Sequence, residues 1–450
     1  MTEQQTPNPP GQRWWRNRRK LLAALGSVAI LLAGSAAVAY AMFKRPADVD
    51  RGEVVPFVQE EPKRAVVKTT NWPLFGFNRA RTRFVPANRV KPPFKRLWKY
   101  GARPLLEFPP IFVGGRLYFV DNNGHAVSLD ADSGKVLWKR RIAKLNASAP
   151  AYWRGRLLIV NLEPGQVLSL NARTGKTIWK RSLSSRSESS PVAVRGRVYF
   201  GDEGGNLHSL RARDGRTVWT TQLSGPVKAA PAYRDGKLYV GDYGGEMSAV
   251  RARNGEIVWQ AGAQGLSFSR TGAFYSTPAV AFGRVYSGNN DGRVYSFDSG
   301  TGELAWSHST GGYVYSGPAV AGTPHTPPTV YIGSFDGNVY ALDARTGDAR
   351  WTRSAGGRVI GSLSVIGNIV YVATFDGTTT SGFKLKGGRK VFEYHTGAYM
   401  PAISDGRRLY LTGYSSVHAL QPFDRAAQRR EQRKKRRAQR RTAVAEPAGS

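Results

Sequence analysis

The chain has 450 residues, a formal net charge of +35 and no cysteine. The lack of cysteine excludes disulfide bonds, thiol nucleophiles and Cys-ligated zinc or iron–sulfur centres. The positive charge indicates affinity for anionic surfaces such as phospholipid headgroups, envelope polymers or nucleic acid, and the compartment decides among these.

The N-terminus carries the signals that set the compartment. Five basic residues lie between Arg13 and Lys20, and an uncharged run of 23 residues extends from Leu21 to Phe43. Such a run can span a bilayer, and the basic residues before it place the N-terminus in the cytoplasm. We therefore predict a cytoplasmic segment at 1–20 and a signal-anchor helix at 21–43, with the remainder outside a bacterial cell membrane.

Two alternatives for this N-terminal segment stay open. Residues 39–41 read A-Y-A, which fits the cleavage pattern of a secretory signal peptide. The pair Arg18 and Arg19 also resembles, weakly, a twin-arginine export signal. In each case the rest of the chain lies beyond the cytoplasmic membrane.

Large aromatic residues recur beyond the linker at 44–95 with nearly constant spacing. The intervals are 40, 41, 40, 40, 47, 45 and 41 residues. A period of this size is typical of β-propellers, in which each repeat forms one four-stranded blade. We expect the rings to pack between neighbouring blades. The recurring residues are Trp98, Trp138, Trp179, Trp219, Trp259, Trp306, Trp351 and Phe392.

The two ends of the repeat region indicate how the ring closes. Each full unit shows four short apolar segments, A to D, separated by glycine turns, and the aromatic residue lies on strand D. Trp98 has no strands A to C before it, and the unit from Pro401 to Leu420 has no strand D. Pairing them removes the open edge. We predict an all-β, eight-bladed propeller at 96–422 and a disordered basic tail at 423–450.

Two sets of residues resemble a known family. The first set is V-Y-A-L-D-A-R-T-G-D-A-R-W at 339–351 together with V-S-L-D-A-D-S-G-K-V-L-W at 127–138. The second is N-W-P-L-F-G at 71–76 together with R-T-R-F at 81–84. They resemble the repeats and the N-terminal signature of pyrroloquinoline-quinone (PQQ)-like β-propellers. That family includes quinoprotein dehydrogenases and non-enzymatic scaffolds of the BamB type.

The same resemblance indicates which groups a catalytic member of this family needs. Quinoprotein dehydrogenases hold PQQ against a vicinal disulfide, beside a calcium or lanthanide ion and a catalytic Asp. This chain has no cysteine, and no compact acidic cluster matches the metal ligands. Asn171, Arg211 and Arg251 also stand where other repeats carry Asp130 and Asp343. We therefore predict no catalytic, cofactor-binding or metal-binding residue, and PQQ binding remains the alternative.

The connections of such blades emerge on two faces. The B–C turns and D–A connections share one face, which we call the acidic face because its B–C turns are rich in Asp and Gly. The A–B and C–D turns share the other, which we call the basic face because many of them carry arginine. Ordinary hairpin chemistry and a solvated surface are the alternative explanations. The candidate contacts to an anionic surface are Arg173, Arg213, Arg253, Arg345, Arg429, Arg430, Arg433, Lys434, Lys435, Arg436 and Arg437.

The long interval after Trp259 predicts an enlarged D–A loop at 267–275 on the acidic face. Its candidate partner contacts are Phe268, Arg270, Phe274 and Tyr275, although simple drift in loop length explains the interval equally well.

The predicted function is that of a single-pass, membrane-anchored extracytoplasmic propeller, acting as a non-catalytic scaffold for an envelope protein or an anionic polymer. We expect no nucleic-acid partner. A PQQ-dependent oxidoreductase and an extracytoplasmic ligand sensor are the alternatives.

Overall fold

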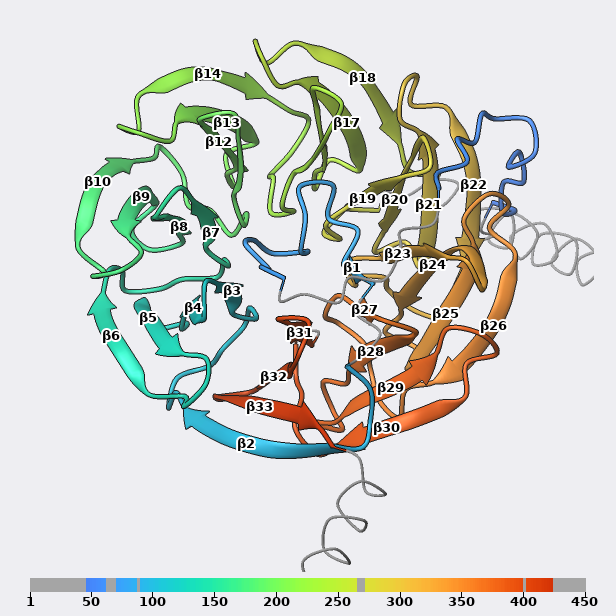
Figure 1. Cartoon of the computed structure of the whole chain (residues 1–450). Coiled ribbons are helices and arrows are strands. Elements are labelled where there is room, and N and C mark those ends of the chain that lie inside the picture. The colour runs from blue at the N-terminus through green and yellow to red at the C-terminus, as the bar shows by residue number, and fades with distance from the viewer. Residues whose placement is uncertain (1–45, 62–69, 87–89, 265–271, 400–401, 424–450) are drawn as a thin grey trace, which may run out of the picture. The chain divides into compact units, whose positions relative to one another are not determined.

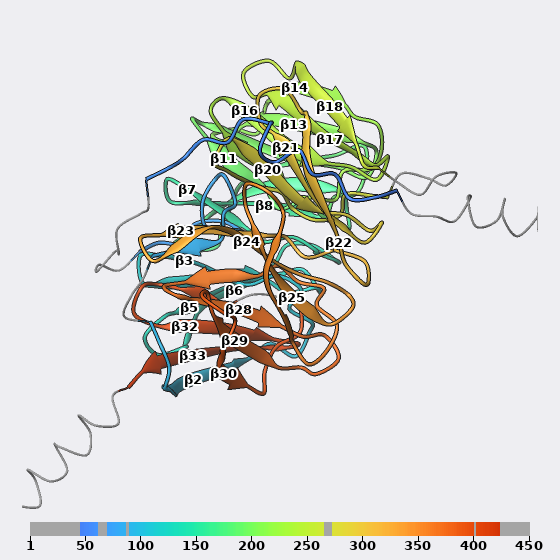
Figure 2. The same ribbon diagram turned by 90° about the vertical axis from the view of Figure 1, so that its right-hand side faces the viewer.

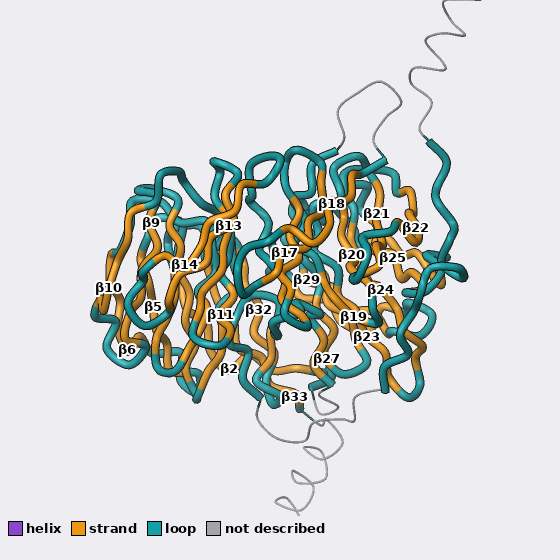
Figure 3. Tube along the Cα trace, turned by 90° about the horizontal axis from the view of Figure 1, so that it is seen from above, coloured by secondary structure: helices purple, strands orange, loops and turns teal. Residues whose placement is uncertain are grey.

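The computed structural model describes residues 46–61, 70–86, 90–264, 272–399 and 402–423. The predicted membrane helix at 21–43 and the tail beyond residue 423 lie outside these ranges. Among the described residues no helix has the length and apolar character that crossing a bilayer requires. Only strands and loops occur in this part of the chain (Figure 3).

Eight sheets are arranged in a ring around a central axis (Figure 1). Seven of them have four strands, and the eighth gains a short fifth strand from the segment that precedes the ring. Strands A to D of each blade pair antiparallel with their neighbours, and strand A is the innermost of the four, whereas the added strand β1 pairs in parallel with strand A of its blade. The predicted all-β, eight-bladed propeller is confirmed.

The blades follow one another in chain order. Blade 1 consists of β3 (Ile111–Val113), β4 (Arg116–Val120), β5 (His125–Asp130) and β6 (Val136–Arg141), and blade 2 of β7 (Ala151–Trp153), β8 (Arg156–Asn161), β9 (Gln166–Asn171) and β10 (Thr177–Ser182). Blade 3 consists of β11 (Val192–Val194), β12 (Arg197–Gly201), β13 (Asn206–Arg211) and β14 (Thr217–Gln222), and blade 4 of β15 (Ala232–Arg234), β16 (Lys237–Gly241), β17 (Glu246–Arg251) and β18 (Ile257–Gly262).

Blades 5 to 8 continue the pattern, and blades 7 and 8 recruit strands from before the ring. Blade 5 consists of β19 (Ala279–Ala281), β20 (Arg284–Gly288), β21 (Arg293–Asp298) and β22 (Leu304–Ser309), and blade 6 of β23 (Ala319–Thr323), β24 (Thr326–Gly333), β25 (Asn338–Asp343) and β26 (Ala349–Ser354). Blade 7 consists of β27 (Ser364–Ile366), β28 (Ile369–Ala373), β29 (Thr380–Lys384) and β30 (Lys390–Tyr394) with β1 (Phe84–Val85) added. Blade 8 consists of β31 (Ile403–Ser404), β32 (Leu409–Gly413) and β33 (Ser416–Pro422) with β2 (Phe94–Gly101) added.

Blade 8 closes the ring with both ends of the propeller. Strand β2 runs antiparallel beside β33, with Trp98 opposite Ala419 and Phe94 opposite Pro422 (Figure 2). The start of β2 and the end of β33 therefore lie together on the basic face. The predicted closure by Trp98 is confirmed.

The recurring tryptophans join neighbouring blades at seven of the eight interfaces. Each indole N–H donates to a backbone carbonyl in the C–D turn of the following blade, over 2.8–3.3 Å, so the ring is fixed by a hydrogen bond as well as by packing. The donor and acceptor pairs are Trp98 and Ala131, Trp138 and Ala172, Trp179 and Ala212, Trp219 and Ala252, Trp259 and Ser299, Trp306 and Ala344, and Trp351 and Leu385.

A glycine in the same C–D turn receives the indole face. Gly175 has φ +71°, and a Cβ there would lie 2.7 Å from Cε3 of Trp138. Two features of the turn require glycine at this position: the left-handed backbone and the close approach of the indole ring. At the interface between blades 7 and 8, Phe392 replaces tryptophan and packs edge-on against Phe94 at 5.3 Å.

Residues 71–85 fill the middle of the ring, where they appear as a blue trace (Figure 1). Carbonyl groups of this segment accept hydrogen bonds from the middle amide of the innermost strand in six blades. The donor and acceptor pairs are Phe112 and Trp72, Tyr152 and Pro73, Tyr233 and Arg79, Val280 and Ala80, Val320 and Thr82, and Val365 and Arg83, at 2.7–2.9 Å. We call this segment the plug.

Two buried arginines hold the plug on the axis. Arg81 and Arg83 are both fully buried. Nε of Arg81 donates to the carbonyl of Pro231 over 2.8 Å, and Nη1 of Arg83 donates to the carbonyl of Pro318 over 3.0 Å. Burial lowers the pKa of Arg83 to about 9. The innermost strands thus meet around two cationic groups whose hydrogen-bond acceptors are backbone carbonyls.

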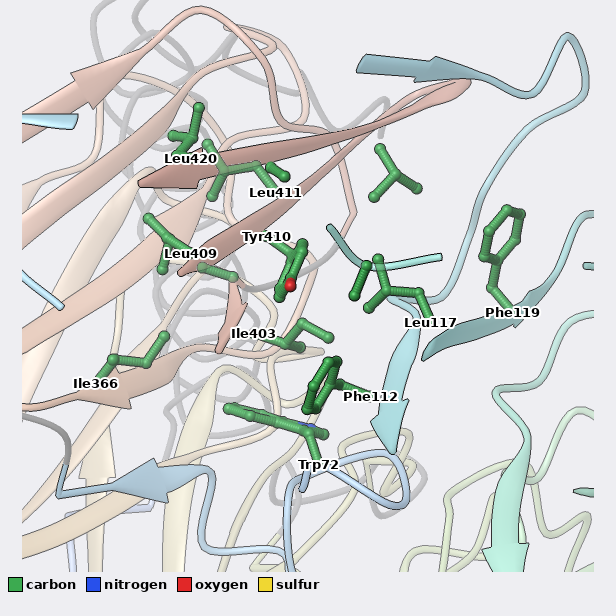
Figure 4. Close-up of a cluster of buried hydrophobic side chains, with 14 of the residues drawn as sticks. Trp72, Phe112, Leu117, Phe119, Ile366, Ile403, Leu409, Tyr410, Leu411 and Leu420 are labelled. Atoms are coloured by element: carbon green, nitrogen blue, oxygen red, sulfur yellow. The ribbon is translucent and has the colours of Figure 1, made fainter. Parts of the chain in front are cut away.

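The plug also completes the core between the last blade and the first. Trp72, 1% exposed, lies against Phe112, with Tyr410 and Ile403 beside them (Figure 4). The rings of Phe112 and Tyr410 stack at 6.2 Å. The family-like N-W-P-L-F-G stretch therefore fills the junction between blade 8 and blade 1.

We expect Gly175→Ala to destabilise the protein more than Gly155→Ala. Both glycines lie in blade 2 and have positive φ, but a Cβ at Gly155 meets nothing within 4 Å. The left-handed backbone costs about 1 kcal/mol in either variant. Displacing Trp138 adds about 1–3 kcal/mol in the Gly175 variant alone. Equilibrium guanidinium unfolding, followed by tryptophan fluorescence, checks this difference, and equal midpoints for the two variants would contradict it.

Candidate functional site

The acidic face narrows at the axis to a funnel with a cavity of about 110 Å³. Its floor is Phe75 of the plug, and the guanidinium groups of Arg81 and Arg83 lie over the ring of Phe75 at 5.8 and 5.2 Å. Its walls come from D–A connections, so residues distant in sequence converge there. The ionisable residues lining it are Glu107, Glu188, Lys228, Tyr275, Tyr315 and Tyr399.

The carboxylates of the funnel have different environments. Lys228 Nζ lies 2.9 Å from Glu188 Oε1 and 3.3 Å from Glu203 Oε1. Burial opposes the charge of Lys228, but the hydrogen bond and the charge of Glu188 outweigh it and raise the pKa of Lys228. Glu107 has no such ion pair among the described residues. Burial, together with the charge of Glu188, raises the pKa of Glu107 to about 7.

Aromatic side chains continue outward from the funnel in a connected series. The rings of Tyr243 and Tyr275 meet edge to face at 6.1 Å, and those of Tyr275 and Tyr315 at 5.6 Å. The ammonium group of Lys228 lies 5.6 Å from the centre of the Tyr243 ring. Burial raises the pKa of Tyr243 to about 12, so its hydroxyl stays protonated and can donate a hydrogen bond at neutral pH.

The series extends across blades 6 to 8. Phe335 lies 6.2 Å from Tyr315, and the guanidinium of Arg358 stacks 4.8 Å over Phe335 and 5.6 Å over Phe375. The ring of Phe375 in turn lies 5.1 Å from Tyr399. Tyr313 also joins it, 5.8 Å from Tyr315 and 53% exposed. We call this series the aromatic arc: Tyr243, Tyr275, Tyr313, Tyr315, Phe335, Phe375 and Tyr399 with Lys228 and Arg358.

The structure separates the residues predicted for the enlarged loop. Phe268 and Arg270 lie outside the described residues. Phe274 is fully buried and packs against Tyr295 at 5.6 Å, so its side chain belongs to the core between blades 4 and 5. Tyr275 borders the funnel and belongs to the aromatic arc.

The predicted basic-face residues of the C–D turns are exposed, but they differ in their partners. Arg345 pairs with Glu53 at 2.6 Å, and Arg213 lies 3.7 Å from Asp214. Arg173 and Arg253 have no ion pair within the described part of the chain. The candidate residues of the tail, from Arg429 to Arg437, lie outside it.

Other arginines of the basic face have a structural role that sequence reasoning missed. The first residue of strand B in several blades donates to a backbone carbonyl in the C–D turn of the next blade. These contacts are Arg116 to Arg173 (3.1 Å), Arg156 to Arg213 (2.7 Å) and Arg197 to Arg253 (2.7 Å). The regular spacing of these arginines was a signal for such contacts between blades.

Of the aromatic arc, sequence reasoning singled out Tyr275 as a candidate contact and did not connect it with the other members, because they come from different loops. The available signal was an aromatic residue in several B–C turns, such as Tyr243, Phe335 and Phe375. Their convergence depends on the closed ring.

Comparison with known proteins identifies the family. A family model described as outer membrane protein assembly factor BamB matches residues 94–229, 163–312 and 215–432, and together these matches span most of the chain. The chain belongs to this family. One curated relative, the quinate/shikimate dehydrogenase (quinone) of Acinetobacter baylyi, is 28% identical over 120 residues. Those residues are 23% of this chain and only 14% of that enzyme.

Solved structures show the same fold. BamB from Moraxella catarrhalis aligns with a TM-score of 0.61 at 19% identity, covering 73% of this chain and 100% of that one. The quinohemoprotein alcohol dehydrogenase ADHIIG from Pseudomonas putida HK5 aligns with a TM-score of 0.66 at 14% identity, covering 79% and 80%. At these identities the likeness concerns the fold alone.

The funnel residues do not fit a quinone cofactor of this kind. PQQ is a tricarboxylic acid, whereas the funnel presents Glu107 and Glu188. Its one lysine or arginine among the described lining residues, Lys228, is already paired with two glutamates. The cavity of about 110 Å³ is also below the roughly 300 Å³ typical of small-molecule sites. No group of three or more His, Asp or Glu within the described ranges is placed to hold a metal ion.

We expect Glu107→Gln to stabilise the protein more at pH 8 than at pH 5. The pKa of this carboxyl rises to about 7 on folding. At pH values between its pKa in the unfolded chain and its pKa in the folded protein, the folded state therefore binds more protons than the unfolded state does. Stability from this group is therefore present at low pH and lost as the pH rises towards 7. Chemical unfolding of both proteins at pH 5 and pH 8 checks this. A difference between the proteins that is the same at both pH values would contradict the assignment.

Proposed function

We propose that the chain is a non-catalytic binding propeller that presents its acidic face to a partner protein of the bacterial envelope. The observation that carries this proposal is the aromatic arc. Tyrosine and arginine are enriched in the residues that dominate protein–protein binding energy. Here they lie side by side on one face, with Tyr313 53% and Tyr243 38% exposed.

The arc is supported by a rigid frame. Arg358 is fixed between two rings by Asp376, whose Oδ2 accepts from Arg358 Nε over 2.7 Å. Each ring of the arc also contacts at least one neighbouring member, so little side-chain freedom remains to be lost on binding. Loops carried on a rigid scaffold are where binding residues are most often found.

A PQQ-dependent oxidoreductase is the enzymatic alternative, and the funnel supports it poorly. Its carboxylates would repel the carboxylates of the cofactor. The ion pairs of Lys228 would have to break before this side chain could bind the cofactor. We therefore propose that the chain binds no PQQ.

The proposal includes a location. The apolar run at 21–43 would anchor the chain in the bacterial cell membrane in a single pass, with the propeller on the extracytoplasmic side. The basic face, where both ends of the propeller emerge, would add affinity for an anionic envelope polymer through residues such as Arg173 and Arg253. A nucleic-acid partner is not part of this proposal.

Site-specific photo-crosslinking in cells tests the proposed face. Tyr313 and, as the matched control, Ile178 on the outer strand β10 are each replaced by p-benzoylphenylalanine. Both positions are exposed and apolar, at 53% and 43%, but only Tyr313 belongs to the arc. We expect a discrete protein adduct from position 313 and none from position 178, read by immunoblotting and mass spectrometry. No adduct at 313, or the same adducts at both positions, would contradict the proposal.

A further inference from the structure

The plug pairs with the innermost strands of six blades and omits blades 3 and 8, and the gap at blade 3 lies between two blades that it does pair with. In blades 2 and 4, the amides of Tyr152 and Tyr233 donate to Pro73 and Arg79 of the plug, each over 2.7 Å. Ala193 holds the same middle position in β11 of blade 3. Its amide has no acceptor among the described residues, although Ala193 is only 5% exposed.

The local conformation of the plug explains the omission. Between Pro73 and Arg79 the chain turns toward the axis, with φ +83° at Gly76 and φ +74° at Phe77. The amide of Phe77 donates back to Leu74 over 3.1 Å. This turn uses the residues that would otherwise reach blade 3, and it leaves the edge of β11 uncovered.

A groove lies where the plug turns away. Its volume is about 1170 Å³, and it opens on the basic face beside β11. Leu74 and Ala193 form an apolar floor, and Trp153 and Tyr233 stand on either side. At this position of the innermost strand, blades 2 and 4 carry the large side chains of Tyr152 and Tyr233, whereas blade 3 carries alanine. The small side chain of Ala193 therefore contributes to the volume of the groove.

The rim of the groove is cationic. Arg79, Arg154 and Arg195 line it with exposed side chains, and none of them has an ion pair within the described ranges. Arg234 also lines it but is paired with Glu60 at 2.9 Å and lies 3.4 Å from Asp235. Asp235 is the one acidic residue among the described lining residues. The free charge around the groove is therefore positive.

We propose that this groove binds an acidic peptide in an extended conformation, which pairs with β11 through the amide of Ala193. A nearly buried amide without a partner is rare in proteins and marks a place where another acceptor fits. Strand addition to a sheet edge satisfies such amides with main-chain carbonyls, while pockets select the side chains. Here apolar side chains would lie on Leu74 between Trp153 and Tyr233, and carboxylates would meet Arg79, Arg154 and Arg195.

The peptide can be tested directly on the full-length protein. The probe is a fluorescent, end-blocked octapeptide of alternating glutamate and valine, with a lysine–valine octapeptide and polyglutamate as comparisons. We expect the first to bind and the lysine peptide not to bind. Hydrogen–deuterium exchange is expected to slow at 192–194 when the glutamate–valine peptide is added. Polyglutamate binding without protection of β11 would identify a general anion site and overturn the proposal.

Two variants distinguish the contribution of main-chain pairing to peptide binding from the contribution of charge. Ala193→Pro removes the outward amide without removing a hydrogen bond to β12, because the corresponding amides of other blades point at the plug. It is expected to weaken peptide binding about fivefold, the effect of one hydrogen bond. The control Ala193→Ser keeps the amide and is expected to bind as the wild type does.

The double variant Arg154→Glu with Arg195→Glu is expected to weaken binding about tenfold and to admit the lysine peptide. If Ala193→Pro is unfolded by circular dichroism, exchange at 192–194 in the wild type decides the question. Unchanged binding in a folded Ala193→Pro protein, or no binding of the glutamate–valine peptide at 1 mM, would overturn the proposal.

Discussion

The ring depends on one repeated contact, in which a tryptophan of the outer strand is held by the C–D turn of the next blade at seven of the eight interfaces between blades. The indole donates to a carbonyl of that turn and lies against a glycine that has no side chain to displace it, as Trp138 does at Ala172 and Gly175. Each contact fixes one blade relative to its neighbour. Because Trp98 makes the same contact from the N-terminal strand, blade 8 is held to blade 1 in the same way and the circle closes without a free edge.

A ring held at its outer side still needs contacts at its axis, and the plug supplies them. Arg81 donates to the carbonyl just before the innermost strand of blade 4, and Arg83 to the one just before that of blade 6, so the buried charges tie these blades to the plug. The plug also divides the centre of the molecule. On the acidic face Phe75 becomes the floor of the funnel, and on the basic face the turn at 74–78 leaves the edge of β11 open. The two candidate binding regions thus follow from the path of a single segment.

The repeat made the fold predictable, because spacing along the chain determines which residues occupy equivalent positions in every blade. Trp98 as the closing strand and Tyr275 as an acidic-face residue both followed from that spacing. The burial of Phe274 did not follow, since this residue comes from a connection that is longer than in the other repeats and packs against Tyr295 of β21. The aromatic arc and the gap at Ala193 could not be predicted either. They depend on loops of different blades, and on a plug, that meet only in the closed ring.

The central claim is that the acidic face binds a partner with its loops while the funnel holds no quinone. The most direct measurement is the melting temperature of the full-length protein with and without PQQ and Ca²⁺, read together with the absorption spectrum of the protein after gel filtration. A ligand that binds only the folded state raises the melting temperature. We expect no shift and no retained quinone absorption. A raised melting temperature with a stoichiometric bound chromophore would contradict the account.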